Sequence, residues 1–184
     1  MDTKDHILSV AQRLIQQRGV NGFSYADIAA EVGIRKASLH HHFATKTDLV
    51  QHLLERYSQQ LEDYLAGLPD ADSRVLLEQY AGLYQSNLCD QRACMGGMLA
   101  AEVMTLDPSL RPALERFVSV QERWLCGVLE RGQARGEIVR SATPAQQSAM
   151  LISTLQGALL FARAGGNDAF FLESVKGVLS SLHA

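Results

Sequence analysis

The stretch from Phe23 to Leu49, FSYADIAAEVGIRKASLHHHFATKTDL, limits what this chain can fold into more than any other part of it. Ser24 is a favourable helix N-cap, and Asp27, three residues later, can bond back to the Ser24 amide. Gly33 permits a turn after this first short helix. A second short helix is predicted from about Arg35 to Phe43. Two short helices joined by such a turn make a helix-turn-helix.

The second of these helices has one apolar face. Leu39 and Phe43 lie on the side that packs inward. The remaining positions point outward or sideways and carry side chains that can touch DNA: Lys36, Ala37, Ser38, His40 and His41.

The segment IAAEVGIRKASLHHHFATKTDLV resembles the DNA-binding segment of the TetR family of bacterial transcriptional repressors. The family pattern is matched at Ile28, Ala29, Gly33, Leu39, His41, Phe43, Lys46 and Leu49. His40 is a departure, because members of the family usually carry Tyr at this position. An imidazole can still donate a hydrogen bond to a phosphate, but the contact would then depend on pH.

The resemblance implies an all-α fold of about nine helices. Residues 1–50 would form a helix-turn-helix DNA-binding domain, and residues 51–184 a helical effector-binding and dimerisation domain. It also implies a mechanism, in which an effector favours a dimer whose recognition helices are wrongly spaced for the two halves of an operator.

The expected DNA contacts are Ser24, Tyr25, Arg35, Lys36, Ala37, Ser38, His40, His41 and Lys46. Arg35 and Lys36 begin the recognition helix, where a long basic side chain can reach guanine acceptors in the major groove. Arg35 could equally be a solvated charge at a helix start. No metal or other cofactor is expected, because three consecutive histidines project about 100° apart on a helix and lack the spacing of helical metal ligands.

Composition is compatible with a DNA-binding head. The net charge is −3, but residues 1–56 hold seven Lys or Arg against six Asp or Glu, and the remaining residues ten against fourteen. The small positive excess is therefore at the DNA-binding end. The sequence has neither a secretion signal nor a long apolar run, so a cytoplasmic protein with reduced cysteines is expected.

Periodicity and capping signals predict helices throughout the chain. Those outside the helix-turn-helix are expected at about 4–18, 46–65, 73–86, 93–104, 110–135, 144–164 and 168–182, with Gly96 and Gly97 interrupting the fourth of these. The last two carry more apolar surface than one protomer needs. By resemblance they form a four-helix homodimer interface, although they could instead complete the monomer core.

Cys94 is the candidate for a thiol sensor. It lies near a predicted helix start, two residues after Arg92, and both features favour thiolate, the reactive form of cysteine. Some TetR-like repressors respond to electrophiles or oxidants through a cysteine in this middle region. Cys89 could be its resolving partner, while a buried inert cysteine is the alternative for Cys94.

A small apolar or electrophilic effector is expected to bind in the helical body. The candidate lining residues are Tyr57, Tyr64, Tyr80, Tyr84, Met98, Phe117, Gln121, Trp124 and Met150. Each could alternatively be a core residue. Two functions of another class also remain open: a helical small-molecule enzyme and a protein-protein adaptor, each with a vestigial DNA-binding head. The sequence contains no catalytic constellation in support of an enzyme.

Overall fold

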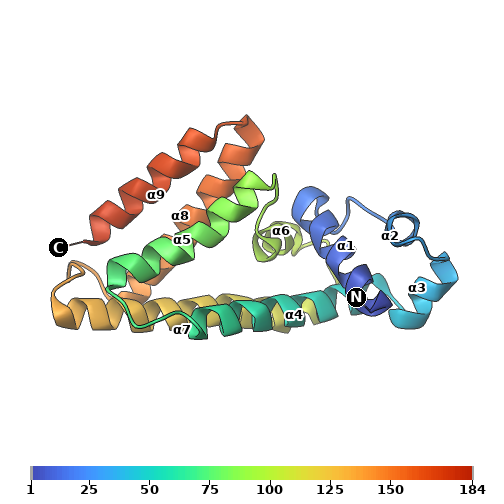
Figure 1. Cartoon of the computed structure of the whole chain (residues 1–184), viewed down its shortest axis with the longest axis horizontal. Coiled ribbons are helices and arrows are strands. Elements are labelled where there is room, and N and C mark those ends of the chain that lie inside the picture. The colour runs from blue at the N-terminus through green and yellow to red at the C-terminus, as the bar shows by residue number, and fades with distance from the viewer. Residues whose placement is uncertain (1, 184) are drawn as a thin grey trace. The chain divides into compact units, whose positions relative to one another are not determined.

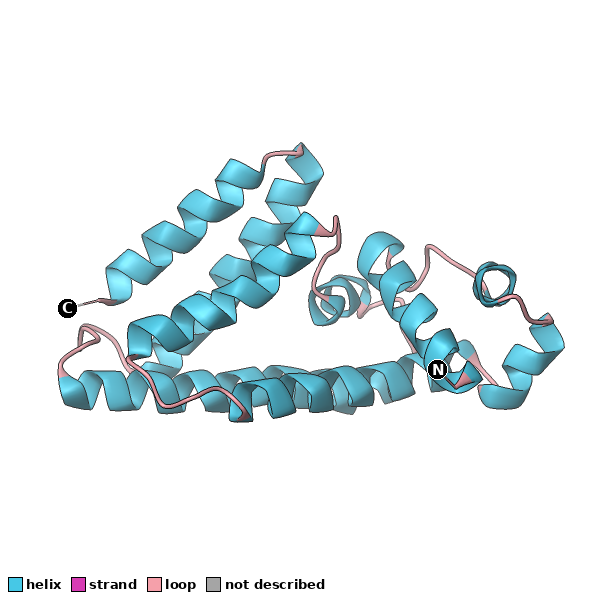
Figure 2. Ribbon diagram, in the orientation of Figure 1, coloured by secondary structure: helices cyan, strands magenta, loops and turns pink. Residues whose placement is uncertain are grey.

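The computed structural model describes residues 2–183, which contain nine α-helices and one short 3₁₀-helix (Figures 1 and 2). Their bounds are α1 Thr3–Arg18, α2 Tyr25–Val32, α3 Lys36–His42, α4 Lys46–Ala66, α5 Ser73–Cys89, α6 Met95–Glu102, η1 Pro108–Leu110, α7 Arg111–Arg135, α8 Pro144–Gly165 and α9 Asp168–Leu182. The all-α prediction is confirmed. None of the helices in residues 2–183 has the length and hydropathy needed to cross a bilayer.

Reciprocal capping pairs begin three of the helices, and the pair at α2 is the one predicted above. Ser24 and Asp27 form a capping box at α2, and Thr143 and Gln146 form one at α8. At α4, the Thr45 amide donates to the Asp48 carboxylate (2.9 Å), while the Asp48 amide donates to the Thr45 hydroxyl (3.0 Å). Each pair satisfies amides that a helix start otherwise leaves without partners.

The described residues pack as two compact units. One unit comprises residues 2–59 and 95–117, and the other residues 60–94 and 118–183. In the first unit, α1, α2 and α3 share a core with α4, and Leu99 of α6 and Leu110 of η1 belong to the same cluster. In the second unit, α8 and α9 lie side by side (Figure 1).

The expected interruption at Gly96 and Gly97 does not occur, since α6 continues through both glycines. A Cβ atom on Gly96 would lie 2.1 Å from Cε1 of Phe117, so a close approach of that ring explains this glycine. The helix is also shorter than predicted and ends at Glu102. The 3₁₀-helix η1 directly precedes α7, so the helix expected from about residue 110 begins at Arg111.

Candidate nucleic-acid interface

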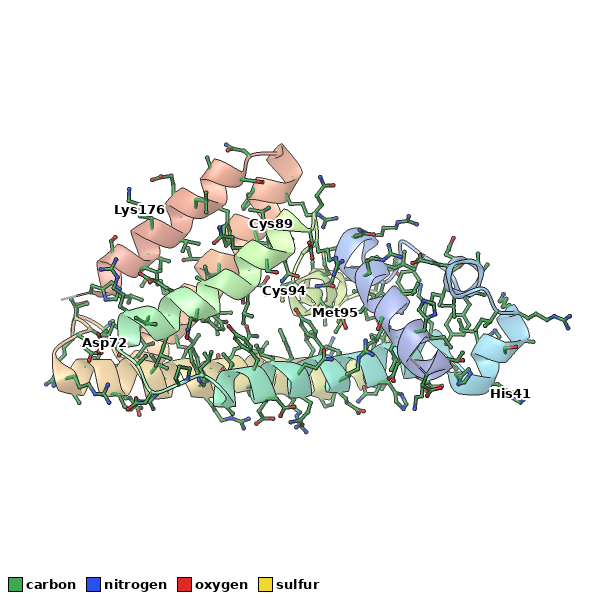
Figure 3. The ribbon with its side chains drawn as sticks, in the orientation of Figure 1. His41, Asp72, Cys89, Cys94, Met95 and Lys176 are labelled. Atoms are coloured by element: carbon green, nitrogen blue, oxygen red, sulfur yellow. The ribbon has the colours of Figure 1, made fainter. Side chains whose placement is uncertain are left out.

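The recognition helix α3 is held from one side and open on the other. Leu39 is fully buried and Phe43 is 1 % exposed, as expected for the inward face. The outward positions are all exposed: Arg35, which is the N-cap of α3, and Lys36, Ala37, Ser38, His40 and His41. His41 lies at the outer edge of this unit (Figure 3). A short helix exposed in this way can enter a major groove.

Beside α3 lies a shallow depression of about 320 Å³. It is lined by Phe23, Ser24, Tyr25, Lys36, His40 and Lys46. Five of these six residues were predicted DNA contacts, and they come from three consecutive helices and the turns before them. The depression combines two ammonium groups with the start of α2, a combination suited to a phosphate.

The Tyr25 hydroxyl forms hydrogen bonds within the protein, although Tyr25 was expected to contact DNA. The residue is 7 % exposed, and its hydroxyl lies 3.1 Å from the carbonyl oxygen of Phe43 and 2.5 Å from that of Thr45. Burial, reinforced by the charge of Asp48, raises the pKa of Tyr25 to about 12. The Tyr25 hydroxyl therefore connects α2 to the turn between α3 and α4, because it donates its proton to carbonyl groups there.

Lys46 is likewise engaged internally. Its ammonium donates hydrogen bonds to the carbonyl oxygens of Val20 and Phe23, and Nζ lies 4.1 Å from the centroid of the Phe23 ring. Burial lowers the pKa of Lys46, while the charges of Glu102 and Asp27 oppose that shift. An ammonium has three donors, so one proton remains for a phosphate at the start of α4.

One ring nitrogen of His40 forms a hydrogen bond within the protein. Nδ1 lies 3.1 Å from the carbonyl oxygen of Ala44, and a carbonyl only accepts, so Nδ1 carries a proton. The imidazole centroid is 4.8 Å from that of Tyr25. In the neutral ring Nε2 is then an acceptor, and it becomes a donor only when the ring is protonated.

In the second unit, four of the predicted effector-site residues form one cluster. The hydroxyls of Tyr80 and Tyr84 donate to Oε1 of Gln121, at 2.7 and 3.0 Å. The Tyr80 ring stacks on Trp124, with centroids 5.9 Å apart. Burial raises the pKa of Tyr80 above its ordinary range, so the hydroxyl stays protonated and serves as a donor.

The other predicted effector-site residues are dispersed. Tyr57 and Phe117 stack in the first unit, with centroids 5.4 Å apart, and Met98 packs against the core of that unit. Tyr64 and Met150 are each 42 % exposed. Their exposure differs from the expected lining of an internal pocket, because both positions fall on outward faces of their helices.

The cysteines differ in exposure. Cys94 is 4 % exposed and directly precedes α6, whereas Cys89, the last residue of α5, is exposed. Both are free thiols, and Figure 3 labels them. Arg92, whose charge was expected to favour thiolate at Cys94, lies 3.7 Å from the carboxylate of Asp90. Arg92 is thus paired with a carboxylate two residues before it.

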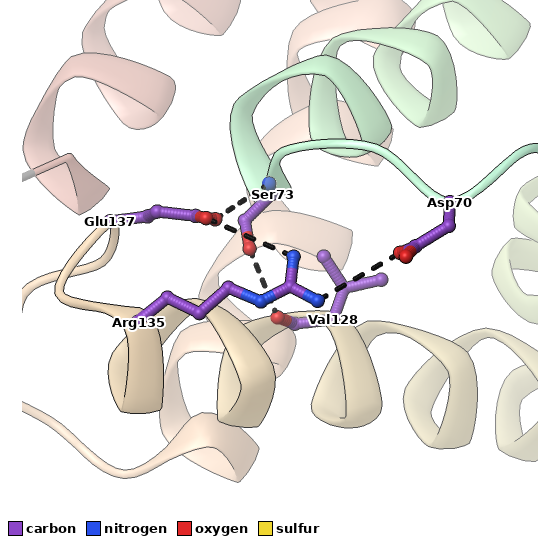
Figure 4. A network of polar contacts seen from close by, with 5 residues as sticks. All are labelled: Asp70, Ser73, Val128, Arg135 and Glu137. Atoms are coloured by element: carbon purple, nitrogen blue, oxygen red, sulfur yellow. Dashed lines mark hydrogen bonds and ion pairs between the residues drawn. The ribbon is translucent and has the colours of Figure 1, made fainter.

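A polar network fixes the start of α5 in the second unit (Figure 4). The Ser73 amide donates to Oε2 of Glu137 at 2.9 Å, and the Ser73 hydroxyl donates to the carbonyl oxygen of Val128 at 3.3 Å. Arg135 lies 3.9 Å from both Asp70 and Glu137. The hydrogen bonds from Ser73, followed by the charge of Arg135, lower the pKa of Glu137. Glu137 thereby caps a helix that its own N-cap side chain leaves uncapped.

Sequence profiles of known families match both parts of the chain. The profile described as bacterial regulatory proteins, tetR family, matches residues 7–53, and that described as the tetracyclin repressor-like C-terminal domain matches residues 74–176. The second match alone covers more than half of the chain. This protein belongs to the TetR family.

Individual TetR-family relatives support that placement. The chain is 26 % identical over 168 residues to the HTH-type transcriptional repressor NemR of Escherichia coli K12, a match that covers 88 % of this chain and 84 % of NemR. It is 26 % identical over 148 residues to the HTH-type transcriptional regulator CymR of Pseudomonas putida, covering 74 % and 70 %. A crystal structure of a TetR-family transcriptional regulator from Agrobacterium tumefaciens is 35 % identical, with a TM-score of 0.94 and coverage of 99 % and 98 %.

One contact within the first unit was missed by the sequence analysis. Glu102, the last residue of α6, accepts hydrogen bonds from the turn between α1 and α2. A signal was available in principle, because a carboxylate at a helix C-terminus is disfavoured by the helix dipole and so needs another reason to be there. Its partners lie more than 80 residues earlier, and local patterns give no information on such pairing.

Proposed function

We propose that this TetR-family protein is a dimeric repressor that binds operator DNA through α3 and the adjacent depression, and leaves the operator when an effector binds. The observation that carries the proposal is the convergence of Ser24, Lys36, His40 and Lys46 around one depression beside the exposed face of α3. Phosphate contacts at this depression would set the register of α3, while Arg35 and Lys36 reach for bases.

The dimer would form through α8 and α9. Four large apolar side chains on these neighbouring helices are exposed: Met150 at 42 %, Phe161 at 71 %, Phe170 at 47 % and Leu172 at 46 %. Phe161 and Phe170 also contact each other edge to face, with centroids 6.3 Å apart. Apolar surface concentrated on two adjacent helices favours association, and a two-fold dimer presents two recognition helices to the two halves of an operator.

The effector would be a small, mostly apolar molecule that uses the hydroxyls and amide of the cluster formed by Tyr80, Tyr84, Gln121 and Trp124. These polar atoms now satisfy each other, so a ligand must replace those hydrogen bonds with its own. An electrophile that acts at Cys94 is the other effector class that we consider, because this thiol directly precedes α6. Its burial means that access requires a local opening.

DNA binding is tested with a duplex that the wild-type protein enriches from a random pool, by fluorescence anisotropy over a series of salt concentrations. We expect Lys46→Ala to weaken binding to every duplex about uniformly and to reduce the salt slope by about one. Lys36→Ala should in addition relax base preference. Arg131→Ala, which removes an exposed basic side chain of α7, is the matched control. Unchanged affinity for both head variants would contradict the proposal.

The thiol route is tested on the same duplex with N-ethylmaleimide as the electrophile. If Cys94 is the sensor, Cys94→Ser binds DNA but no longer releases it on treatment, whereas Cys89→Ser responds as the wild type does. Release of Cys94→Ser by the reagent would exclude Cys94 and leave a non-covalent ligand as the effector.

A further inference from the structure

The turn between α1 and α2, residues 19–23, is held by the carboxylate of Glu102. Oε2 accepts a hydrogen bond from the Val20 amide at 2.6 Å. Oε1 lies 3.3 Å from both the backbone amide and the side-chain amide of Asn21. The Asn21 side chain also donates to the Thr105 hydroxyl at 2.9 Å. The turn is thus bonded to α6 and to the residues that follow α6.

The fit between Glu102 and this turn leaves no room for a side chain at Gly19. A Cβ atom there would lie 2.6 Å from Oε1 of Glu102, and Gly19 has a φ of +77°, in the region that glycine adopts most readily. Two independent requirements therefore select glycine at this position. The carboxylate accepts hydrogen bonds from backbone amides, and hydrogen bonds to a charged group are stronger than those between neutral groups.

The same turn is held from its carbonyl side by Lys46. The ammonium donates to the carbonyl oxygens of Val20 and Phe23, and the charge of Glu102 helps to keep that ammonium protonated against the effect of burial. Val20 is therefore bonded twice, through its amide to Glu102 and through its carbonyl to Lys46. The peptide groups of the turn connect a negative charge on α6 to a positive charge at the start of α4.

We propose that Glu102 is a positioning residue, which sets the DNA-binding competence of the head by holding residues 19–23 and, through them, Lys46. This inference rests on the proposed DNA-binding function. Phe23 ends the turn and Ser24 caps α2, and both line the depression with Lys46. Loss of this carboxylate would change the geometry of three residues of the depression together, namely Phe23, Ser24 and Lys46.

Two variants with different severity test the proposal on the full-length protein. Glu102→Ala removes all three hydrogen bonds, and Glu102→Gln keeps one acceptor but places an N–H group against the turn. Glu115→Gln, at an exposed position of α7, is the matched control. Hydrogen exchange measured at Val20 and Asn21 should be faster in both Glu102 variants than in the wild type and in the control.

The effect on DNA is measured with a duplex enriched by the wild-type protein from a random pool, in a double-mutant cycle with Lys46→Ala. Glu102→Ala should weaken binding by about tenfold, and it should weaken binding much less when Lys46 is already alanine. Faster exchange with unchanged affinity would reduce Glu102 to a structural contact and overturn the proposal. Independent, multiplying effects of the two substitutions would overturn it as well.

The same experiments distinguish a failure of the proposed DNA-binding function from a failure of the positioning role of Glu102. If the wild-type protein enriches no duplex, the DNA-binding function itself is refuted, and the positioning role with it. The exchange rates at Val20 and Asn21 still report whether the hydrogen bonds to Glu102 form in solution. Faster exchange throughout α1 would instead identify unfolding of the head, in which case the milder Glu102→Gln decides the outcome.

Discussion

The hydroxyl of Tyr80 on α5 donates a hydrogen bond to Oε1 of Gln121 on α7, at 2.7 Å. Tyr84, one turn along α5, donates to the same oxygen at 3.0 Å. One amide oxygen therefore satisfies two phenols, and the three residues are all buried. Gln121 thus connects both phenols of α5 to α7.

Replacing Gln121 with Met should leave both hydroxyls without that acceptor while keeping a side chain of similar length. We expect the free energy of unfolding to fall by about 1–3 kcal/mol, because buried hydroxyls that lose a partner carry a desolvation cost. Urea denaturation measures this change. Tyr84→Phe is the control and should cost about 1 kcal/mol or less, since Tyr80 still donates to Gln121. Equal losses for the two variants would contradict the shared-acceptor interpretation.

Replacing His40 with Tyr should strengthen DNA binding. Nδ1 of His40 already donates to the carbonyl oxygen of Ala44, so the neutral ring presents only an acceptor at Nε2, whereas a tyrosine hydroxyl can donate to a phosphate. We expect affinity to rise by about threefold or more.

Fluorescence anisotropy at matched ionic strength measures the change in affinity. His42→Gln, which removes an exposed histidine of the same helix, is the control and should leave affinity unchanged. The explanation fails if His40→Tyr binds DNA no more tightly than the wild type.

Acid should weaken the second unit partly through Glu137. Hydrogen bonds from Ser73 lower its pKa below the ordinary value of 4.5, so its carboxylate stabilises the fold above that value. This contribution is lost as the pH falls below about 4.5 and through the lower pKa of the folded state. Glu137→Gln should therefore lower the urea midpoint at pH 7 and flatten its dependence on pH in the acid range.

The control for that measurement is Glu173→Gln, at an exposed position on α9. It should change neither the midpoint at pH 7 nor the acid dependence. A midpoint of Glu137→Gln that falls with acid as steeply as that of the wild type would show that other carboxylates account for the effect.

Gly96→Ala should destabilise the first unit. The added Cβ atom would approach Phe117 to about 2 Å, and overpacking of this kind typically costs about 1–3 kcal/mol. Gly82→Ala, in α5 where a Cβ atom meets nothing within 4 Å, should instead stabilise the protein by up to about 1 kcal/mol. Thermal unfolding compares the two. Phe117→Leu combined with Gly96→Ala should recover part of the loss, and no recovery would indicate a different cause.

The sequence alone was enough to predict the structural features that depend on residues close together in the chain. The capping box at Ser24, the turn at Gly33 and the inward face of α3 follow from hydrogen bonds and side-chain spacing within one or two helical turns. The all-α fold and the membership of the TetR family also rest on such local patterns, and for that reason the sequence was sufficient to infer both.

Tertiary structure decided the contacts between segments that are distant in sequence. The close contact that requires glycine at position 96 involves a ring 21 residues later, and the internal bonds of Tyr25 depend on carbonyl groups of the turn before α4. Glu102 and Val20 are 82 residues apart. Pairing over such distances results from packing of the whole unit, which no local pattern of hydropathy or capping encodes, and it is this packing that places a carboxylate of α6 on the DNA-binding head.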